Sequence, residues 1–539
     1  MKVAVRSDTY WLGRVPGVNI RGMTYTLPDN CVPLVAGLTY TPASDLWVEG
    51  DPSFIAWDAF SITPEYLKPY QQPHAEVALR LPNTLAYHAT GSGKTLTMML
   101  AGLTRAITSG KPLVIVTIAS TKWHWYQQVR RYTNAEKEDI HVLASKTPSD
   151  LEFAKHTVNP QILIINWHIL QYWRHELCKL RAVFIFDETD MARNPKRHKS
   201  SQTPSGKRIR VLDPNSLNAA GHICSASASA RIGGTATLVP TTNMNAWGQL
   251  DLLEPGDWGT SHQFGIHYCG GFPKEYGGFD MSGRTNMGEL QLRIRTMSTR
   301  VKKEAVLKSF GTYQQEVVFL GRDQLNRPGA FSALLKAARR DGPTSNSHVQ
   351  LLQSAASKRA PIIKIIAREF EQGLTKHVVG TGRIIEIERL VAALGKAIPQ
   401  ATIIFGDGST PNRERINQCA RFKHEDNLIL VCGINSYGRG LDGLQYAQRA
   451  HTAYLPYEPG VIEQWCGRFD RLAEWDVLTR MSFYIAEGTI DERVMALVLS
   501  HLDATLGVSE SDEMRTLMRQ LNKLDDPKAL AKAILGSLL

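Results

Sequence analysis

The sequence lacks the features of a secreted, disulfide-bonded or membrane-spanning protein. It has seven cysteines in 539 residues, an odd number, and no two of them form a C-x-x-C pair. This scarcity argues against a disulfide framework and against a cysteine-based zinc module. The apolar runs are shorter than the roughly 20 residues of a membrane span, and the N-terminal MKVAVRSDTYWLG lacks the apolar core of a secretory signal. We therefore expect a soluble, intracellular, cytoplasmic protein, with a nuclear location left open.

The composition is that of a basic globular protein. Hydrophobic residues make up 43% of the chain and charged residues 21%, and both values are ordinary for a folded protein. The formal net charge is +11, and such a balance favours a polyanionic partner. A nucleic acid is the first expectation and an acidic membrane surface the second, and we predict no membrane partner.

Short apolar runs that alternate with helical patterns predict two α/β segments. QILIIN at 161–166 and AVFIFD at 182–187 end in polar residues, which is typical of parallel strands that are buried on both faces and present functional residues at their carboxyl ends. The fold class is therefore α/β with parallel sheets. Further strands are expected at 113–119, 377–381, 401–406, 427–432, 450–455 and 481–486.

These patterns predict five divisions of the chain. The tail is expected to be helical because Asp526 followed by Pro527 is a good helix start. The divisions are a small β-rich N-terminal module (1–61), a first α/β domain (62–245), a connecting region (246–345), a second α/β domain (346–505) and the tail (506–539).

The segment HATGSGKT has the composition of a phosphate-binding loop, and it stands between an apolar strand pattern and a helical one. Gly91 and Gly93 would let backbone N–H groups face the phosphates of ATP. Lys94 would bring a positive charge to the β- and γ-phosphates, and Thr95 would offer its hydroxyl to Mg²⁺. His88 stands where such loops usually have their first glycine. The predicted nucleotide-binding residues of this loop are Thr90, Gly91, Ser92, Gly93, Lys94 and Thr95.

A second motif, VFIFDETD, delivers two carboxylates from the end of an apolar strand. Asp187 would hold Mg²⁺, and Glu188 would orient and deprotonate the attacking water. A strand-end capping pair is the alternative for these two residues taken alone. The phosphate loop upstream favours the catalytic interpretation.

With both motifs in place, residues 64–500 resemble the superfamily-two helicases, and within them the Swi/Snf-type DNA translocases. The segment LKPYQQPHA resembles an element in which Gln71 would read adenine. DETDMARNPKRHKS resembles the acidic motif of the family and keeps Asn194, although Asp190 replaces the usual histidine. The resemblance implies two RecA-like P-loop lobes that hydrolyse ATP at a shared cleft.

Other segments match in the same order. In RIGGTATLVPTTN, the resemblance implies that Thr235, Ala236 and Thr237 link hydrolysis to the nucleic-acid track, and RTMSTRVKKEAV resembles the segment that joins the lobes. FGDGSTPNRERINQCARF and EGTIDERV match elements of the second lobe. In RGLD, the family implies nucleotide contacts from Gly440 and Asp442. In EQWCGRFDRL, it implies that Arg468 and Arg471 act as arginine fingers on the γ-phosphate.

Two basic stretches are candidate DNA contacts, because lysine and arginine clusters neutralise phosphates independently of base sequence. A solvated loop and a solvated helix face are the alternatives. Trp123 and Trp125 could stack on bases, with core packing the favoured interpretation. The candidate residues are Lys196, Arg197, Lys199, Lys207, Arg208 and Arg210 in the first stretch and Arg300, Lys302 and Lys303 in the second.

The sequence thus predicts an ATP- and Mg²⁺-dependent motor that moves along DNA, with duplex DNA favoured over single strands and RNA a weaker alternative. A strand-separating DNA or RNA helicase is the second hypothesis, kept open by the TAT and RGLD variants. A P-loop switch without motor function is a rival, against which the intact lysine, glutamate and arginine pair argue. A nuclease–helicase fusion lacks a separate cluster of metal-binding carboxylates. Protein partners are not predicted.

Overall fold

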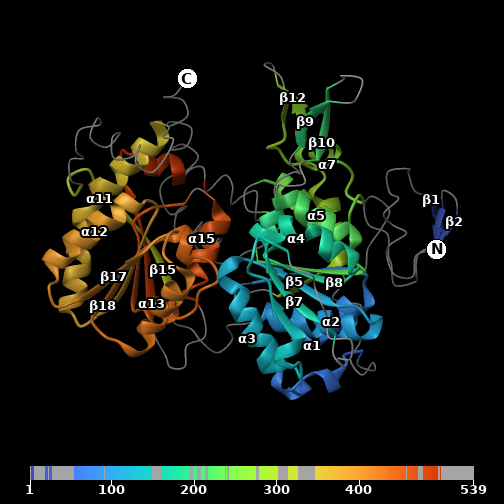
Figure 1. Cartoon of the computed structure of the whole chain (residues 1–539). Helices are drawn as coiled ribbons and strands as arrows, with labels where there is room; N and C mark the ends of the chain where they lie inside the picture. The colour runs from blue at the N-terminus through green and yellow to red at the C-terminus, as the bar shows by residue number, and fades with distance from the viewer. Residues whose placement is uncertain are drawn as a thin grey trace. The chain divides into compact units, whose positions relative to one another are not determined.

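The computed structural model divides the chain into two compact units, Met1–Lys302 and Lys303–Leu539. Each unit has its own parallel sheet flanked by helices (Figure 1). Within the described residues, no helix is both long enough and apolar enough to cross a membrane. The structure describes residues 2–4, 19–21, 24–26, 54–89, 91–148, 160–193, 198–202, 208–212, 217–236, 238–239, 242–274, 278–301, 313–325, 346–456, 458–470, 478–495 and 498.

The first unit is built on a seven-stranded sheet in the order β14-β4-β11-β8-β5-β7-β6. All neighbouring strands are parallel, and the predicted strands at 113–119, 161–166 and 182–187 are confirmed. The strands are β4 (Asn83–His88), β5 (Leu113–Thr117), β6 (Ile140–Val142), β7 (Ile162–Asn166), β8 (Val183–Asp187), β11 (Ala230–Thr235) and β14 (Ser298–Val301).

Helix α2 (Lys94–Ser109) is buried along most of its length, from Leu96 to Thr104. It begins after Gly93 and ends at Gly110, both left-handed, so glycine sets its two limits. Its buried Met98 and Leu100 belong to the same apolar cluster as Ile115 and Ile185 of the sheet. The other helices are α1 (Gln71–Arg80), α3 (Lys122–Tyr132), α4 (Trp167–Lys179), α5 (Leu217–Ser227), α6 (Met244–Leu253), α7 (Ser261–Cys269) and α8 (Met287–Met297).

The second unit has a six-stranded sheet in the order β15-β20-β19-β16-β18-β17. Its neighbouring strands are again parallel, and all five strands predicted here are confirmed. The strands are β15 (Tyr313–Leu320), β16 (Lys376–Thr381), β17 (Thr402–Gly406), β18 (Leu428–Gly433), β19 (Arg449–Thr452) and β20 (Thr479–Ala486). The helices are α11 (Asn346–Glu371), α12 (Ile384–Ala397), α13 (Asn412–His424), α14 (Ile434–Tyr437) and α15 (Pro459–Cys466).

Strand β18 of the second sheet is buried on both faces, and its alternate residues show why its sequence is continuously apolar. Leu428, Leu430 and Cys432 pack into one apolar cluster, whereas Ile429 and Val431 pack into another beneath α11 and α12. Successive strand residues point to opposite faces, so a strand covered on both sides has no polar face. Figure 1 shows α11 and α12 on the side of this sheet away from α13 and α15.

The two sheets share one strand order once β14 is set aside. Reading from β4, the first sheet runs β4-β11-β8-β5-β7-β6, and the second runs β15-β20-β19-β16-β18-β17. The strand that leads into the phosphate loop therefore has β15 as its counterpart. The parallel α/β fold class predicted from the sequence is confirmed for both units.

Three small antiparallel sheets complete the described structure. Within the predicted N-terminal module, β1 (Lys2–Ala4), β3 (Thr24–Thr26) and β2 (Asn19–Arg21) pair in that order. β9 (His198–Gln202) pairs with β10 (Arg208–Leu212), and β12 (Phe272–Pro273) pairs with β13 (Phe279–Asp280). The predicted connecting region supplies β14 to the first sheet and β15 to the second, and the predicted tail lies outside the described residues.

Candidate active site

The loop between β4 and α2 has the backbone geometry of an anion-binding turn. Gly91 and Gly93 have φ of 75° and 82°, values at which any other side chain would be strained. Helix α2 starts directly with Lys94 and Thr95, and the first N–H groups of a helix have no partner within the helix. The loop therefore offers donors and a lysine to one anion. Of the other predicted loop residues, Ser92 is fully buried and Thr90 lies outside the described residues.

Side chains at the start of α1 hold this loop in place. The Tyr70 hydroxyl donates to the Ser92 carbonyl at 2.6 Å, and Gln71 Nε2 donates to the Gly93 carbonyl at 3.1 Å. Gln71 Oε1 accepts from the Lys68 backbone N–H at 2.9 Å, so both ends of this buried amide are engaged. A Cβ at position 93 would lie 2.6 Å from Gln71 Nε2, which requires glycine there. Gln71 thus contacts the phosphate loop, and its contact with adenine stays a prediction.

His88 ties the start of the loop to two other elements. Its ring is fully buried, and its Nε2 lies 3.2 Å from His74 Nδ1 and 3.0 Å from Thr299 Oγ1. The Ala89 backbone N–H donates to the Val301 carbonyl at 3.0 Å. Burial lowers the pKa of His88 well below its usual range, so the ring is neutral. The residue that replaces glycine therefore links the loop to α1 and to β14, the last strand before the chain leaves the first unit.

Asp187 is the most firmly oriented acid of the site. Its Oδ2 accepts from Thr117 Oγ1 and from Trp125 Nε1, each at 2.8 Å, and its side chain is buried at the end of β8. Burial, and next the charge of Glu188, raise the pKa of Asp187, and Lys94 opposes this rise. A carboxylate that is held rigidly beside a second acid in a buried place is a suitable ligand for a cation.

Glu188 follows in a left-handed conformation, with φ of 54°, which turns the chain sharply after the strand. The next residue, Thr189, donates from its hydroxyl to Gln249 Oε1 at 2.8 Å. Gln249 Nε2 donates in turn to the Leu238 carbonyl at 2.7 Å. Thr189, Gln249 and Leu238 are fully buried. A short hydrogen-bonded path therefore joins the acidic motif to the segment that follows β11.

The same β11 brings the lysine and the acid together. Gly234 stands opposite Asp187 in the parallel register of β11 and β8. A Cβ at position 234 would lie 3.3 Å from Lys94 Cδ, so the lysine stem passes over this glycine. Of the three predicted coupling residues, Thr235 and Ala236 are buried and Thr237 lies outside the described residues.

The predicted nucleic-acid contacts are only partly described. The Arg300 guanidinium lies 5.1 Å from the centroid of the Tyr87 ring, within the range of a cation–π contact. Trp123 is 56% exposed, whereas Trp125 is fully buried, so the core-packing interpretation is confirmed for Trp125 and wrong for Trp123. Lys199, Arg208 and Arg210 lie in the β9–β10 hairpin, and Lys196, Arg197, Lys207, Lys302 and Lys303 lie outside the described residues.

In the second unit, the Arg468 side chain contacts the backbone of another segment of the same unit. It is 6% exposed, and its Nη1 donates to the Leu441 carbonyl at 2.9 Å. Arg439 Nε donates to Gln464 Oε1 at 2.6 Å, which joins the RGLD segment to α15. Gly440 has φ of 66° and Asp442 Oδ1 accepts from Gln445 Nε2 at 3.1 Å. Arg471 lies outside the described residues.

Sequence reasoning missed the residues that orient the acid and the loop. Thr117 was expected only as part of a strand and Trp125 only in base stacking or core packing, and no motif showed that both donate to Asp187. Thr117 ends β5, and β5 pairs with β8, so the strand order was the missing information. Tyr70 stands beside the recognised Gln71 in LKPYQQ, and its proximity was the one signal available.

Residues 68–238 match the family model described as DEAD/DEAH box helicase. The first unit carries a helicase domain of superfamily two. The protein is accordingly a nucleic-acid-dependent ATP hydrolase, and the matched range of this helicase domain includes the phosphate loop and both acidic residues. No curated protein matches the chain.

Two solved structures from Sulfolobus solfataricus are similar to the chain at low identity. The SWI2/SNF2 ATPase core in complex with dsDNA has 15% identity and a TM-score of 0.36, covering 83% of this chain and 93% of its own. The SWI2/SNF2 ATPase core domain has 16% identity and a TM-score of 0.37, with coverages of 84% and 91%. At these scores the likeness does not identify the substrate of the helicase domain.

Proposed function

We propose that the protein is an ATP-dependent translocase of the Swi/Snf type that moves along DNA, with duplex DNA as its favoured track. One observation carries the proposed ATP hydrolysis. The Asp187 carboxylate at the end of β8 is held by hydrogen bonds from Thr117 and Trp125, and the neighbouring strand β11 passes beneath the Lys94 side chain. The choice of duplex DNA rests on the ordered sequence resemblances in both units, from LKPYQQPHA to EGTIDERV.

In this proposal the phosphate loop binds the nucleotide. The backbone N–H groups around Gly91 and Gly93 and the Lys94 ammonium receive the phosphates. Gln71 and Tyr70 support the loop through its carbonyls. A loop that is already held in its binding geometry loses little conformational entropy when the nucleotide binds.

The residues at this site fit Mg²⁺, which prefers oxygen ligands. Asp187 contributes a buried carboxylate whose two donors both contact Oδ2, and Thr95 contributes a hydroxyl at the start of α2. Bound with ATP, the ion would neutralise charge on the phosphate oxygens. Glu188 would accept the proton of the attacking water, and the Arg468 and Arg471 guanidinium groups would stabilise charge on the γ-phosphoryl group.

The nucleic-acid track is proposed to reach the ATP site through Thr235, Ala236 and Thr237. The path from Thr189 through Gln249 to the Leu238 carbonyl supports this role, because it connects the acidic motif with the end of this segment. The two basic stretches are proposed to bind phosphates without regard to sequence.

A strand-separating helicase that acts on DNA or RNA is the second candidate. The match of residues 68–238 to the DEAD/DEAH box helicases favours it, as do the TAT and RGLD variants. The two candidates differ in what happens to the duplex and in which nucleic acid stimulates hydrolysis.

The test compares ATP hydrolysis with duplex DNA, single-stranded DNA and RNA, and runs two product assays beside it. Displacement of a third strand from a DNA triplex reports translocation, and release of one strand from a forked duplex reports strand separation. Lys94→Ala should nearly abolish hydrolysis and serves as the inactive control. Strong stimulation by duplex DNA with triplex displacement supports the translocase. Stimulation by single strands or RNA with duplex separation would replace it by the helicase, and hydrolysis indifferent to every nucleic acid would contradict both.

A further inference from the structure

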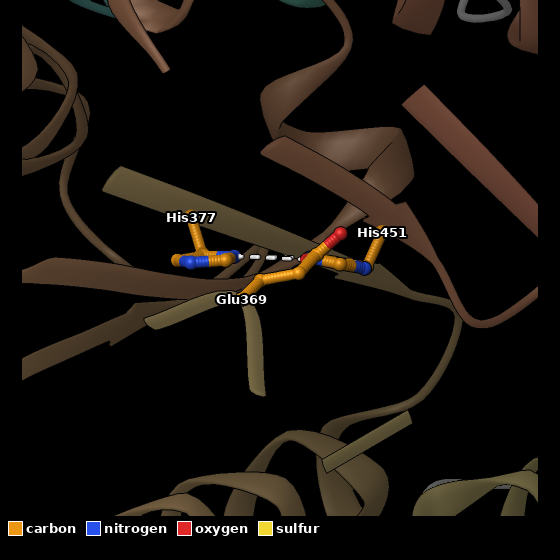
Figure 2. A group of neighbouring side chains, drawn as sticks. All are labelled: Glu369, His377 and His451. Atoms are coloured by element: carbon orange, nitrogen blue, oxygen red, sulfur yellow. Dashed lines mark hydrogen bonds and ion pairs between the residues drawn. The ribbon is translucent and has the colours of Figure 1, made fainter. Parts of the chain in front are cut away.

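Three side chains that no helicase motif includes meet within the second unit. Glu369 lies near the end of α11, His377 is the second residue of β16, and His451 lies in β19. Figure 2 shows the two imidazole rings facing each other with the Glu369 carboxylate beside the line between them. Among the described residues, these are the three whose ligand atoms gather closely enough to hold a metal ion.

The spacing of the three ligand atoms suits a small tetrahedral ion. His377 Nδ1 lies 3.0 Å from His451 Nε2, and Glu369 Oε2 lies 3.4 Å from His451 Nε2 and 3.9 Å from His377 Nδ1. Zinc bonds of about 2.0–2.1 Å in tetrahedral geometry place two ligand atoms roughly 3.3 Å apart. Small side-chain shifts therefore bring all three atoms to bonding distance of one ion.

The opposite end of each side chain is already held. His377 Nε2 donates to the Leu374 carbonyl at 2.6 Å, which leaves the lone pair on Nδ1, the atom that faces the cluster. His451 Nδ1 is hydrogen-bonded to the Tyr484 hydroxyl at 2.9 Å. Glu369 Oε1 lies 2.9 Å from Arg449 Nε. Metal-binding histidines almost always have such a partner on the second ring nitrogen, because it fixes the tautomer and the ring orientation.

Burial takes both imidazoles out of contact with water. His377 and His451 are fully buried. Glu369 Oε2 is buried and accepts no hydrogen bond, a costly state for a carboxylate oxygen that a cation would relieve.

We propose that Glu369, His377 and His451 bind a zinc ion. Two imidazoles and one carboxylate form a known zinc ligand set, in which a water commonly occupies the fourth position. Imidazole ligands disfavour Mg²⁺ and Ca²⁺, which prefer oxygen. Iron in a two-histidine, one-carboxylate site needs open positions for further ligands, and the complete burial of both histidines favours the smaller coordination number.

Without metal, the histidines can form a simple hydrogen-bonded chain. Tyr484 would donate to His451 Nδ1, and His451 Nε2 would donate to His377 Nδ1. That chain leaves Glu369 Oε2 without a donor. With zinc bound, His377 Nδ1 and His451 Nε2 would each give a lone pair to the ion, and Glu369 Oε2 would gain the cationic partner that the hydrogen-bonded chain does not supply.

The location of the cluster indicates a stabilising role. His377 stands at the amino end of β16, whereas Arg439 and Asp442 follow the carboxyl end of β18. Because β16 and β18 are parallel, His377 and the RGLD segment lie toward opposite ends of the strands. Zinc would fasten α11 to β16 and β19, and its loss should weaken the second unit without removing any residue proposed for ATP hydrolysis.

The experiment uses the full-length protein. Zinc content is measured by mass spectrometry after purification and after treatment with a chelator, and thermal melting is followed as zinc is added back. Glu369→Gln and His451→Gln remove ligands with little change in shape, and His424→Gln on α13 alters an exposed histidine of the same unit as the matched control. Cobalt substitution adds a spectroscopic measurement, since tetrahedral Co²⁺ absorbs far more strongly than octahedral Co²⁺.

We expect about one zinc per chain in the wild type and the control, a melting temperature that rises with added zinc, and an intense cobalt spectrum. The two ligand variants should lose all three signals, and Tyr484→Phe should weaken zinc binding about 10–100-fold. A folded wild type that neither keeps nor rebinds zinc would overturn the proposal. Equal zinc binding by Glu369→Gln, His451→Gln and His424→Gln would overturn it as well. If the ligand variants do not fold, the zinc titration and cobalt spectrum of the wild type decide.

Discussion

The two units have the same strand order and differ at the loop that would bind a phosphate. After β4 the chain forms a glycine turn and enters α2 at Lys94. After its counterpart β15, the chain continues as Gly321, Arg322 and Asp323. A lysine and glycines at a helix N-terminus attract an anion, whereas the second turn has an acid near the strand end. The shared fold therefore does not bind nucleotide by itself, and the residues of one loop decide which sheet does.

The buried polar side chains of the two units also differ in their hydrogen-bond partners. In the first unit, buried donors from Thr117 and Trp125 orient an acid for use at the site. In the second unit, the Arg468 guanidinium donates to the backbone carbonyl of Leu441. We propose that the first unit has its site assembled, and that Arg468 would have to leave the Leu441 carbonyl before it acts on phosphate.

Removal of the arginines should have the largest effect among variants of the second unit. We expect Arg468→Ala and Arg471→Ala to reduce turnover by about 10³–10⁵-fold, as arginine fingers do, while ATP affinity changes little because the first unit supplies it. Lysine should rescue either poorly, since a point charge does not reproduce the guanidinium fork. Time courses of nucleic-acid-stimulated ATP hydrolysis measure turnover, and nucleotide titrations measure ATP affinity.

Arg421→Ala is the matched control, because this arginine forms a local ion pair with Glu425 on α13. Arg468 is buried and hydrogen-bonded, so melting curves must show that each variant is folded. Normal turnover by both folded arginine variants would mean that the second unit does not contribute to hydrolysis.

Glu188→Gln should come next and should affect the first unit alone. The amide cannot accept a proton, and loss of a general base typically costs about 10²–10⁴-fold in rate. ATP should still bind, since the phosphate loop is unchanged. Single-turnover hydrolysis and a nucleotide-binding titration separate the two effects, with Glu176→Gln on the surface of α4 as the control. Loss of ATP binding in Glu188→Gln would show a structural role instead.

Most of the strands and the phosphate loop were predictable because each depends on a short stretch of sequence. The apolar run of β18 and the glycines around Lys94 each fit within about ten residues, and the strand and the strand–loop–helix arrangement were predicted correctly. The zinc cluster was not predictable, because Glu369, His377 and His451 come from three elements with no shared motif. The inward hydrogen bond of Arg468 was also hidden, since it depends on the position of the Leu441 carbonyl.

A smaller effect should follow when one donor to Asp187 is removed. Trp125→Phe keeps the ring in the core but deletes the Nε1 hydrogen bond at 2.8 Å. A hydrogen bond to a charged group contributes about 1.5–3 kcal/mol, so we expect turnover to fall about 10–100-fold and the Mg²⁺ requirement to rise. Trp173→Phe deletes an indole hydrogen bond of the same 2.8 Å length, to the Ser145 carbonyl, away from the site. If both variants lose activity equally, the Trp125 effect is general destabilisation and not orientation of the acid.

The smallest effect should come from the support of the phosphate loop, and it tests whether that loop is held in place before ATP binds. Gln71→Ala removes the donor to the Gly93 carbonyl and the acceptor for the Lys68 N–H. Each neutral hydrogen bond contributes about 0.5–1.5 kcal/mol, so ATP affinity should fall by about 5–50-fold while the maximal rate at saturating ATP changes less. Gln72→Ala, which removes a bond to Glu76 on the same helix, controls for a general effect on α1.

A comparison of ATP with GTP separates the two roles of Gln71. If Gln71 supports the loop, its loss lowers the affinity for both nucleotides alike, and if it recognises adenine, its loss lowers the affinity for ATP alone. An unchanged affinity for both nucleotides would mean that the loop is organised without Gln71, and that Tyr70 and the two left-handed glycines are sufficient.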